Sequence, residues 1–191
     1  MEGPPSLRWV REKEGCDRWG TDHRRWTRLL GTGATATRAA AGGGRQVEAV
    51  DFSAVGLQAG RHLAAAKAVG GPITWTVAEA SRFVPAPGCL DLVLVAYLQL
   101  PEDQLRSVVT SAAGALVPGG RLPLVNHDAA NLAEGTGGPQ DPAVLQTPEQ
   151  VTGWMRQAGL NVELAETRNR PVRGVRRPAM DCVVLAAAPG H

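Results

Sequence analysis

Two adjacent residues with acid–base chemistry, His127 and Asp128, open a glycine- and proline-containing loop at residues 126–150. An imidazole has an unperturbed pKa of about 6.5, so His127 can accept a proton at neutral pH as a general base. The carboxylate of Asp128 can orient that imidazole, or bind a cationic substrate. The alternative is that these side chains contact a substrate or anchor the loop by hydrogen bonds. His127 and Asp128 are therefore candidate catalytic residues.

Two further carboxylates stand where short apolar runs end, Asp51 in VEAVDFS and Glu79 in ITWTVAEA. Two more such runs follow, LDLVLVAYLQLP and LVPGGRLPLV. Short runs rich in valine, isoleucine and leucine, without clean polar alternation, are expected of parallel strands covered by helices on both faces. Ligands of open α/β sheets bind at the carboxyl ends of such strands. Asp51 and Glu79 are therefore candidate ligand-binding residues.

Helices are predicted between the strands from their capping residues. Ser53 is a plausible N-cap of an alanine-rich helix that stops at the glycine pair 70–71. Pro101 suits the first turn of a second helix, which Pro-Gly-Gly ends before the next strand. Thr147 begins T-P-E-Q, a capping box that starts a third helix ending near Gly159. These helices would cover the faces of the sheet.

The carboxyl-terminal part of the chain contains two more strand candidates, NVELAETR and MDCVVLAAA, which fit an antiparallel hairpin. Their connector is rich in arginine: Arg168, Arg170, Arg173, Arg176 and Arg177. Such a cluster can attract an anionic substrate or a nucleic acid, or it can be a solvated loop tip. The formal net charge of +2 and the few aromatic residues favour the solvated tip, so we expect no nucleic-acid partner.

The order and content of these runs resemble the class I S-adenosylmethionine-dependent methyltransferases over residues 45–188. The resemblance implies an α/β fold with a Rossmann-like, doubly wound sheet. Its expected strand order is 3-2-1-4-5-7-6, with an antiparallel last strand. It also implies S-adenosylmethionine as the cofactor.

The resemblance assigns roles to residues at the strand ends. Asp51 matches the acidic residue that hydrogen-bonds the ribose hydroxyls, and Phe52 after it would pack against the adenine face. Glu79 in VAEA matches the acidic residue beside the adenine amino group, with Glu in place of Asp, and the amide of Ala80 would donate to an adenine ring nitrogen. Ala96, at the end of LDLVLVA, would also border the cofactor.

The family's glycine-rich turn, D-x-G-x-G-x-G, is degenerate in this chain. Its nearest equivalent is RLLGTGATATR at residues 28–38, where Gly31 and Gly33 are candidate cofactor-binding glycines. The preceding acidic residue is absent, and Thr35 stands where a third glycine is expected. Residues 1–28 show no apolar strand.

The composition of the chain also changes near residue 46, since residues 1–46 are markedly basic and hold three of the five tryptophans. This stretch is interpreted as a divergent or partly disordered amino-terminal segment, or as the product of a shifted reading frame, which we favour. Residues 47–191 would then be the methyltransferase-like domain, with one domain overall.

Length and composition exclude several other classes. A chain of 191 residues with 43% hydrophobic and 20% charged residues fits one soluble globular domain. No apolar stretch approaches a membrane span, and the charged amino terminus does not suit a signal peptide, so we expect a cytoplasmic protein without a membrane partner. The three cysteines and the scattered histidines have no metal-ligand spacing, so no metal site is predicted.

The sequence therefore predicts a methyltransferase that acts on a small molecule, as a monomer or homodimer. Tyr97, just beyond LDLVLVA, is a third candidate catalytic residue that would line the methyl-transfer pocket, or else cap the sheet. The alternative function is an inactive or binding-only relative whose damaged glycine turn no longer holds the cofactor. No sequence motif identifies the methyl acceptor.

Overall fold

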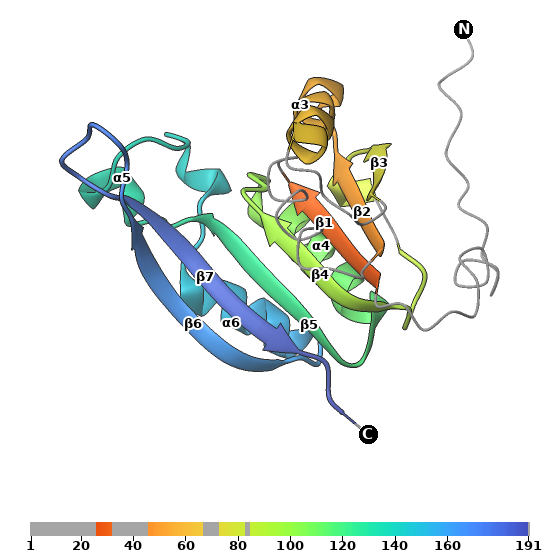
Figure 1. The fold of residues 1–191 in the computed structure, drawn as a ribbon. Helices are drawn as coiled ribbons and strands as arrows, with labels where there is room; N and C mark the ends of the chain where they lie inside the picture. Colours follow the sequence, from red (N-terminus) through yellow and green to blue (C-terminus); the bar gives the residue numbers. More distant parts are fainter. Residues whose placement is uncertain (1–25, 32–45, 67–72, 83–84, 191) are drawn as a thin grey trace, which may run out of the picture.

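The computed structural model describes residues 26–31, 46–66, 73–82 and 85–190 (Figure 1). Seven strands form its sheet: β1 (Trp26–Gly31), β2 (Gln46–Asp51), β3 (Ile73–Val77), β4 (Leu90–Ala96), β5 (Leu116–His127), β6 (Asn161–Arg170) and β7 (Ala179–Ala187). The α-helices are α3 (Ala54–Ala66), α4 (Glu102–Ala115), α5 (Asn131–Glu134) and α6 (Pro148–Gln157), and two short 3-10 helices are η1 (Ala80–Arg82) and η2 (Pro142–Val144). The predicted α/β class is confirmed.

All seven strands belong to one sheet, in the order β3-β2-β1-β4-β5-β7-β6. Neighbouring strands from β3 to β5 pair in parallel, whereas β7 is antiparallel to both β5 and β6. The predicted antiparallel hairpin of the last two strands is thus confirmed. Because β7 alone runs in the opposite direction, the carboxyl ends of the other six strands lie at one edge of the sheet, where β7 begins.

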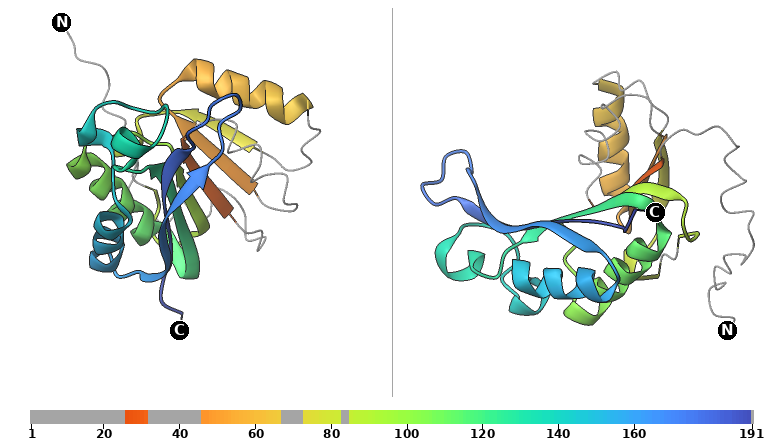
Figure 2. Two further views of the ribbon diagram at one scale, coloured as in Figure 1. Left: turned by 90° about the vertical axis from the view of Figure 1, so that its left-hand side faces the viewer. Right: turned by 90° about the horizontal axis from the view of Figure 1, so that it is seen from below.

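Helices lie on both faces of the sheet, as the buried apolar strands require. Figure 2 shows α3 on one face and α4 with α6 on the other. The main core lies under α4 and α6, where strand residues such as Leu122 and Leu124 and helix residues such as Leu105 and Met155 are fully buried. Each such side chain stabilises the fold by about 1.5–3 kcal/mol through removal of apolar area from water.

The predicted starts of α3 and α6 follow from local chemistry, whereas α4 ends at Ala115 and the Pro-Gly-Gly expected to end it lies within β5. The hydroxyl of Ser53 accepts from the amide of Gly56 at 3.0 Å at the start of α3. Thr147 and Gln150 form the reciprocal capping box of α6, and Gly159 follows that helix with φ +82°. That positive φ is the left-handed conformation that glycine adopts without a Cβ clash.

Strand β1 is the feature that the sequence did not indicate. It pairs with β2 on one side and β4 on the other, so that Leu30 lies opposite Val50 and Gly31 opposite Ala96. This segment, in which Thr27 and Arg28 interrupt the apolar residues, can be a central strand because both of its backbone edges are hydrogen-bonded and strand formation depends strongly on neighbours. Residues 26–31 therefore complete the sheet although they precede the expected boundary at residue 46; the rest of residues 1–45 lies outside the described part.

Hydrogen exchange tests the central position of β1. The amides of residues 26–31 should exchange about as slowly as those of β2, and more slowly than those of the edge strand β3, because β1 is paired on both sides. Mass-spectrometric exchange on the intact chain gives all three rates in one experiment. Exchange of residues 26–31 at the rate of an unfolded chain would contradict the position.

Candidate functional site

The candidate site lies at the edge of the sheet where the parallel strands end. Asp51 ends β2, Ala96 ends β4 and His127 ends β5. Strand pairing places Ala96 between Gly31 of β1 and Val125 of β5, so these chain segments meet at one edge (Figure 1). This is the edge at which open α/β sheets bind ligands.

The turn from β2 into α3 fixes the direction of the Asp51 carboxylate. Its Oδ1 accepts a hydrogen bond from the amide of Ser53 at 2.8 Å. Its Oδ2 faces Gly56, where an added Cβ would lie only 3.3 Å away. No hydrogen bond to Oδ2 occurs among the described residues, and the neighbouring Phe52 is 74% exposed. The turn thus presents a carboxylate oxygen beside an uncovered aromatic ring.

The turn after β3 contains Glu79 and Ala80. Glu79 forms an ion pair with Nε of Arg82 at 2.8 Å, and both side chains are largely exposed. Ala80 is buried at the start of η1. Exposed ion pairs contribute little to stability, so a ligand group can replace Arg82 as the partner of Glu79 at small cost.

A buried charge cluster occupies the part of the edge formed by β4, β5, β6 and β7. Its centre is Asp181, which is 4% exposed. Arg170 binds both carboxylate oxygens, through Nε at 2.7 Å and a terminal nitrogen at 3.2 Å. The hydroxyl of Tyr97 donates to Oδ2 at 3.0 Å, and Nδ1 of His127 lies 3.7 Å from Oδ1. We call these four residues the Asp181 cluster.

The aromatic members of the Asp181 cluster pack against each other. The rings of Tyr97 and His127 have centroids 5.3 Å apart, and the guanidinium carbon of Arg170 lies 5.4 Å from the Tyr97 ring centre. Burial, and then Asp181, raise the pKa of Tyr97. Burial lowers the pKa of His127, an effect that Asp181 opposes and Arg170 reinforces. The arrangement therefore favours a neutral imidazole and a protonated phenol at neutral pH.

The backbone around Tyr97 is held by β5. Tyr97 has φ +52°, and its amide donates to the carbonyl of Val125 at 2.7 Å. The buried side chain of Asn126 accepts from the amide of Leu98 at 2.9 Å and donates to the Leu98 carbonyl at 3.0 Å. It also donates to Oε1 of Gln146 at 2.9 Å. Asn126 thus continues the pairing between β4 and β5 with a side chain where β4 ends.

Asp128 has partners other than His127. Its Oδ1 accepts from the amide of Ala130 at 2.8 Å, and its Oδ2 accepts from the hydroxyl of Thr167 at 2.7 Å. The bond from Thr167 ties the loop after β5 to β6, whereas the bond from Ala130 is local to that loop. The carboxylate beside the His127 imidazole is instead that of Asp181.

The structure therefore brings together two of the three candidate catalytic residues, Tyr97 and His127. Asp181, Arg170 and Asn126 were not identified as site residues from the sequence. In the sequence, Asp181 could have been noticed as an acidic residue at the start of an apolar strand. Its position opposite His127, however, depends on the register of β5 with β7. Gly31 lies at the candidate edge, whereas Gly33 lies outside the described residues.

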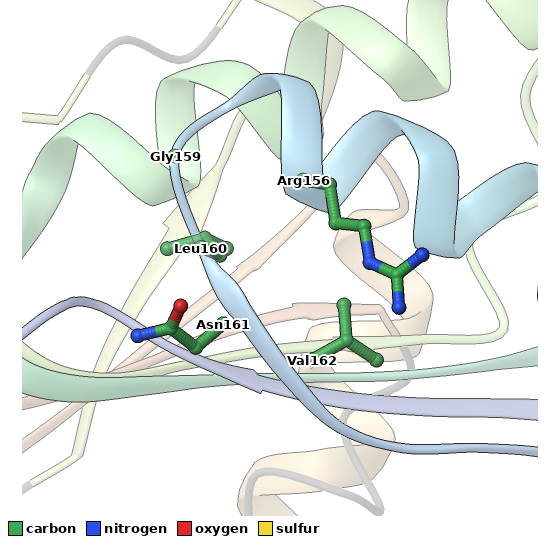
Figure 3. A pocket seen from close by; sticks show the side chains of 5 residues that line it. All are labelled: Arg156, Gly159, Leu160, Asn161 and Val162. Carbon is green, nitrogen blue, oxygen red and sulfur yellow. The ribbon is translucent and has the colours of Figure 1, made fainter.

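A surface depression is found elsewhere, at the junction of α6 and β6 (Figure 3). It is lined by Arg156, Gly159, Leu160, Asn161 and Val162. Because β6 begins there, the depression is at the opposite edge of the sheet from Asp51 and His127. Within the described residues no group of side chains could hold a metal ion, and no helix is long and apolar enough to cross a membrane.

Comparison with protein families identifies a methyltransferase domain at residues 30–120. The matched segment runs from the end of β1 to β5, and so contains Gly31, Gly33, Asp51 and Glu79. Among curated proteins, no significant sequence match is found.

The fold is similar to those of many solved structures. An S-adenosylmethionine-dependent methyltransferase from Methanosarcina mazei has a TM-score of 0.70 at 12% identity, with 88% of this chain and 94% of that chain covered. The N-methyltransferase NodS from Bradyrhizobium japonicum, solved with S-adenosyl-L-homocysteine, has a TM-score of 0.67 at 15% identity and coverages of 86% and 78%. The [4+2]-cyclase SpnF has a TM-score of 0.68 at 14% identity and coverages of 93% and 79%. At these identities the likeness concerns the fold.

The lowered pKa of His127 predicts a pH-dependent contribution to stability. Between the pKa of His127 in the folded protein and its value of about 6.5 in the unfolded chain, the unfolded chain binds more protons. The free energy of unfolding should therefore fall as the pH falls through that interval. His127→Asn should remove this part of the slope, whereas the exposed His62→Asn should retain it. Urea unfolding over a neutral-to-acidic pH series measures both, and equal slopes in the two variants would contradict the burial effect.

Proposed function

We propose that the protein is a class I S-adenosylmethionine-dependent methyltransferase that transfers a methyl group from S-adenosylmethionine to a small molecule; its residues 30–120 match a methyltransferase domain. The observation that carries this proposal is the oriented Asp51 carboxylate at the end of β2, inside the matched segment. The proposed enzyme is cytoplasmic and acts as a monomer or homodimer, without a nucleic-acid partner.

On the cofactor side, Asp51 would accept hydrogen bonds from the two ribose hydroxyls, which suit a carboxylate whose Oδ1 is already positioned by Ser53. Phe52, largely uncovered, would pack against the adenine. Glu79 would exchange Arg82 for the adenine amino group, while the Ala80 amide donates to a ring nitrogen. Ala96 would border the cofactor from the end of β4.

The glycine turn is supported by two findings. Strand β1 ends at Gly31, in the middle of the carboxyl edge, and the family match begins at residue 30. A backbone without a Cβ permits close approach of the amino-acid part of the cofactor, so Gly31 and Gly33 remain its proposed contacts.

On the acceptor side, we assign Tyr97, His127 and Asp128 to the region that receives the methyl acceptor. Tyr97 and His127 are neighbours in the Asp181 cluster, next to Ala96 along the edge. Asp128 acts there through the loop that it ties to β6. Methyl transfer depends mainly on in-line positioning, which a rigid buried network provides.

A fold of this kind does not by itself establish methyl transfer, because the [4+2]-cyclase SpnF shares it. Titration with S-adenosylhomocysteine and detection of methyl transfer from S-adenosylmethionine separate the possibilities. Binding together with transfer supports the proposal, and an absence of cofactor binding would favour the inactive relative.

Replacing Asp51 tests the ribose contact. Asp51→Ala should weaken S-adenosylhomocysteine binding by about tenfold to a few hundredfold, since charge-assisted hydrogen bonds to both hydroxyls are lost. Calorimetry measures the affinity, with Glu163→Gln on β6, at the far side of the sheet, as a matched control for removing one carboxylate. Unchanged affinity in the Asp51 variant would refute the assignment.

Replacing Glu79 tests adenine recognition. Glu79→Ala should reduce the preference for adenosyl over inosyl analogues of S-adenosylhomocysteine, because the acceptor for the amino group is removed. Arg82→Gln is the matched control, since it breaks the same ion pair but keeps Glu79. If the Glu79 variant discriminates as well as the parent, the side chain points away from the adenine.

A further inference from the structure

We propose that Asp181 is a positioning residue that holds His127 as the proton acceptor for an acidic hydroxyl group, such as a phenol, on the methyl acceptor. This inference rests on the proposed function. It differs from the sequence interpretation, in which Asp128 would orient the imidazole, and it names a class of acceptor.

The position of Asp181 determines which nitrogen of His127 carries the proton. Nδ1 of His127 is buried without a hydrogen-bond partner and faces Oδ1 of Asp181 at 3.7 Å. A carboxylate on that side favours the proton on Nδ1 and leaves the lone pair on Nε2. The distance exceeds that of a hydrogen bond, as is common for catalytic pairs in the absence of ligand.

The loop after β5 confines the same ring from another side. Gly138 has φ +78°, and an added Cβ would lie 2.9 Å from both Nδ1 and Cε1 of His127. The loop backbone therefore packs on this part of the ring and leaves no room for a side chain. Asp181, Tyr97 and Gly138 together restrict the orientation of His127.

The charges around His127 favour a hydroxyl over an ammonium group. Asp181 is the carboxylate nearest the imidazole, and its charge is already balanced by the bidentate contact of Arg170. Asp128, the next carboxylate along the chain, is engaged by Thr167 and Ala130. A cationic ammonium group would find no unpaired carboxylate among these groups, whereas the neutral imidazole of His127 can take the proton of an acidic hydroxyl.

The step balances without a further reactant. Nε2 of His127 takes the hydroxyl proton while a lone pair of the oxygen forms the bond to the methyl carbon. The bond between that carbon and the sulfonium sulfur breaks, and its electron pair stays on sulfur. The products are a methyl ether, S-adenosylhomocysteine and an imidazolium, which then releases its proton to water.

Nitrogen NMR of the full chain, labelled in its histidine rings and saturated with S-adenosylhomocysteine, tests the role of Asp181. Neutral His127 should carry its proton on Nδ1. Asp181→Asn should lower the pH midpoint of His127 and weaken that tautomer preference, because the negative charge is lost. Asp128→Asn is the matched control, a second buried carboxylate, and should change neither property.

Arg170→Gln is a second variant, for which we expect the pH midpoint of His127 to shift in the opposite direction. It removes a cation that lowers the pKa of His127, so the midpoint should rise. A proton on Nε2 in the parent protein, or an Asp128 variant that alters the tautomer as much as the Asp181 variant, would overturn the positioning role. The titration with S-adenosylhomocysteine is carried out first. An absence of cofactor binding in that titration would contradict the proposed function, independently of the role of Asp181.

The acceptor class is tested with para-nitrophenol, added to the S-adenosylhomocysteine complex. It should bind as the phenolate, visible in its absorption spectrum, and protonate His127 in the nitrogen spectrum. The matched probe para-nitroaniline, which has a similar shape, should leave His127 unchanged. No response to the phenol, or an equal response to the aniline, would reject the hydroxyl class.

Discussion

The buried negative charge of Asp181 is the constraint on which the acceptor side of the edge depends. An isolated buried carboxylate is strongly unfavourable, so its neighbours must neutralise it and fill its hydrogen-bonding sites. Arg170 and Tyr97 do this from the end of β6 and from the segment after β4. The contacts to Asp181 on β7 therefore fix the end of β6 and the segment after β4 relative to each other.

The segment after β4 must also leave the sheet without losing its backbone hydrogen bonds. Asn126 solves this by offering its side-chain amide to both backbone groups of Leu98. The same arrangement keeps Tyr97 in a left-handed conformation, which is uncommon for a residue other than glycine. Strained residues persist where the surroundings over-determine them and are frequent at functional sites. Here Asn126 holds the backbone of the next residue, Leu98, and Asp181 accepts a hydrogen bond from the Tyr97 hydroxyl.

The two parts of the edge therefore differ in character. Around Asp51 and Phe52 the aromatic ring is largely exposed, and among the described residues only one carboxylate oxygen accepts a hydrogen bond. Around Asp181 and His127 the polar groups are buried and bonded mainly to one another. A cofactor whose ribose and adenine need open contacts suits the first part. A reaction that requires a fixed geometry and little water suits the second.

The sequence alone determined the features that depend on neighbouring residues. The capping box at Thr147, the apolar runs of the strands, and Asp51 and His127 at strand ends follow from periodicity and chemistry within a few positions. Only the tertiary structure decided that residues 26–31 form the central strand and that Asp181 lies beside His127. Tyr97 and Asp181 are separated by 84 positions in the chain, and the register of β5 against β7 brings them together. Such contacts depend on how whole strands pair, and no local pattern encodes that pairing.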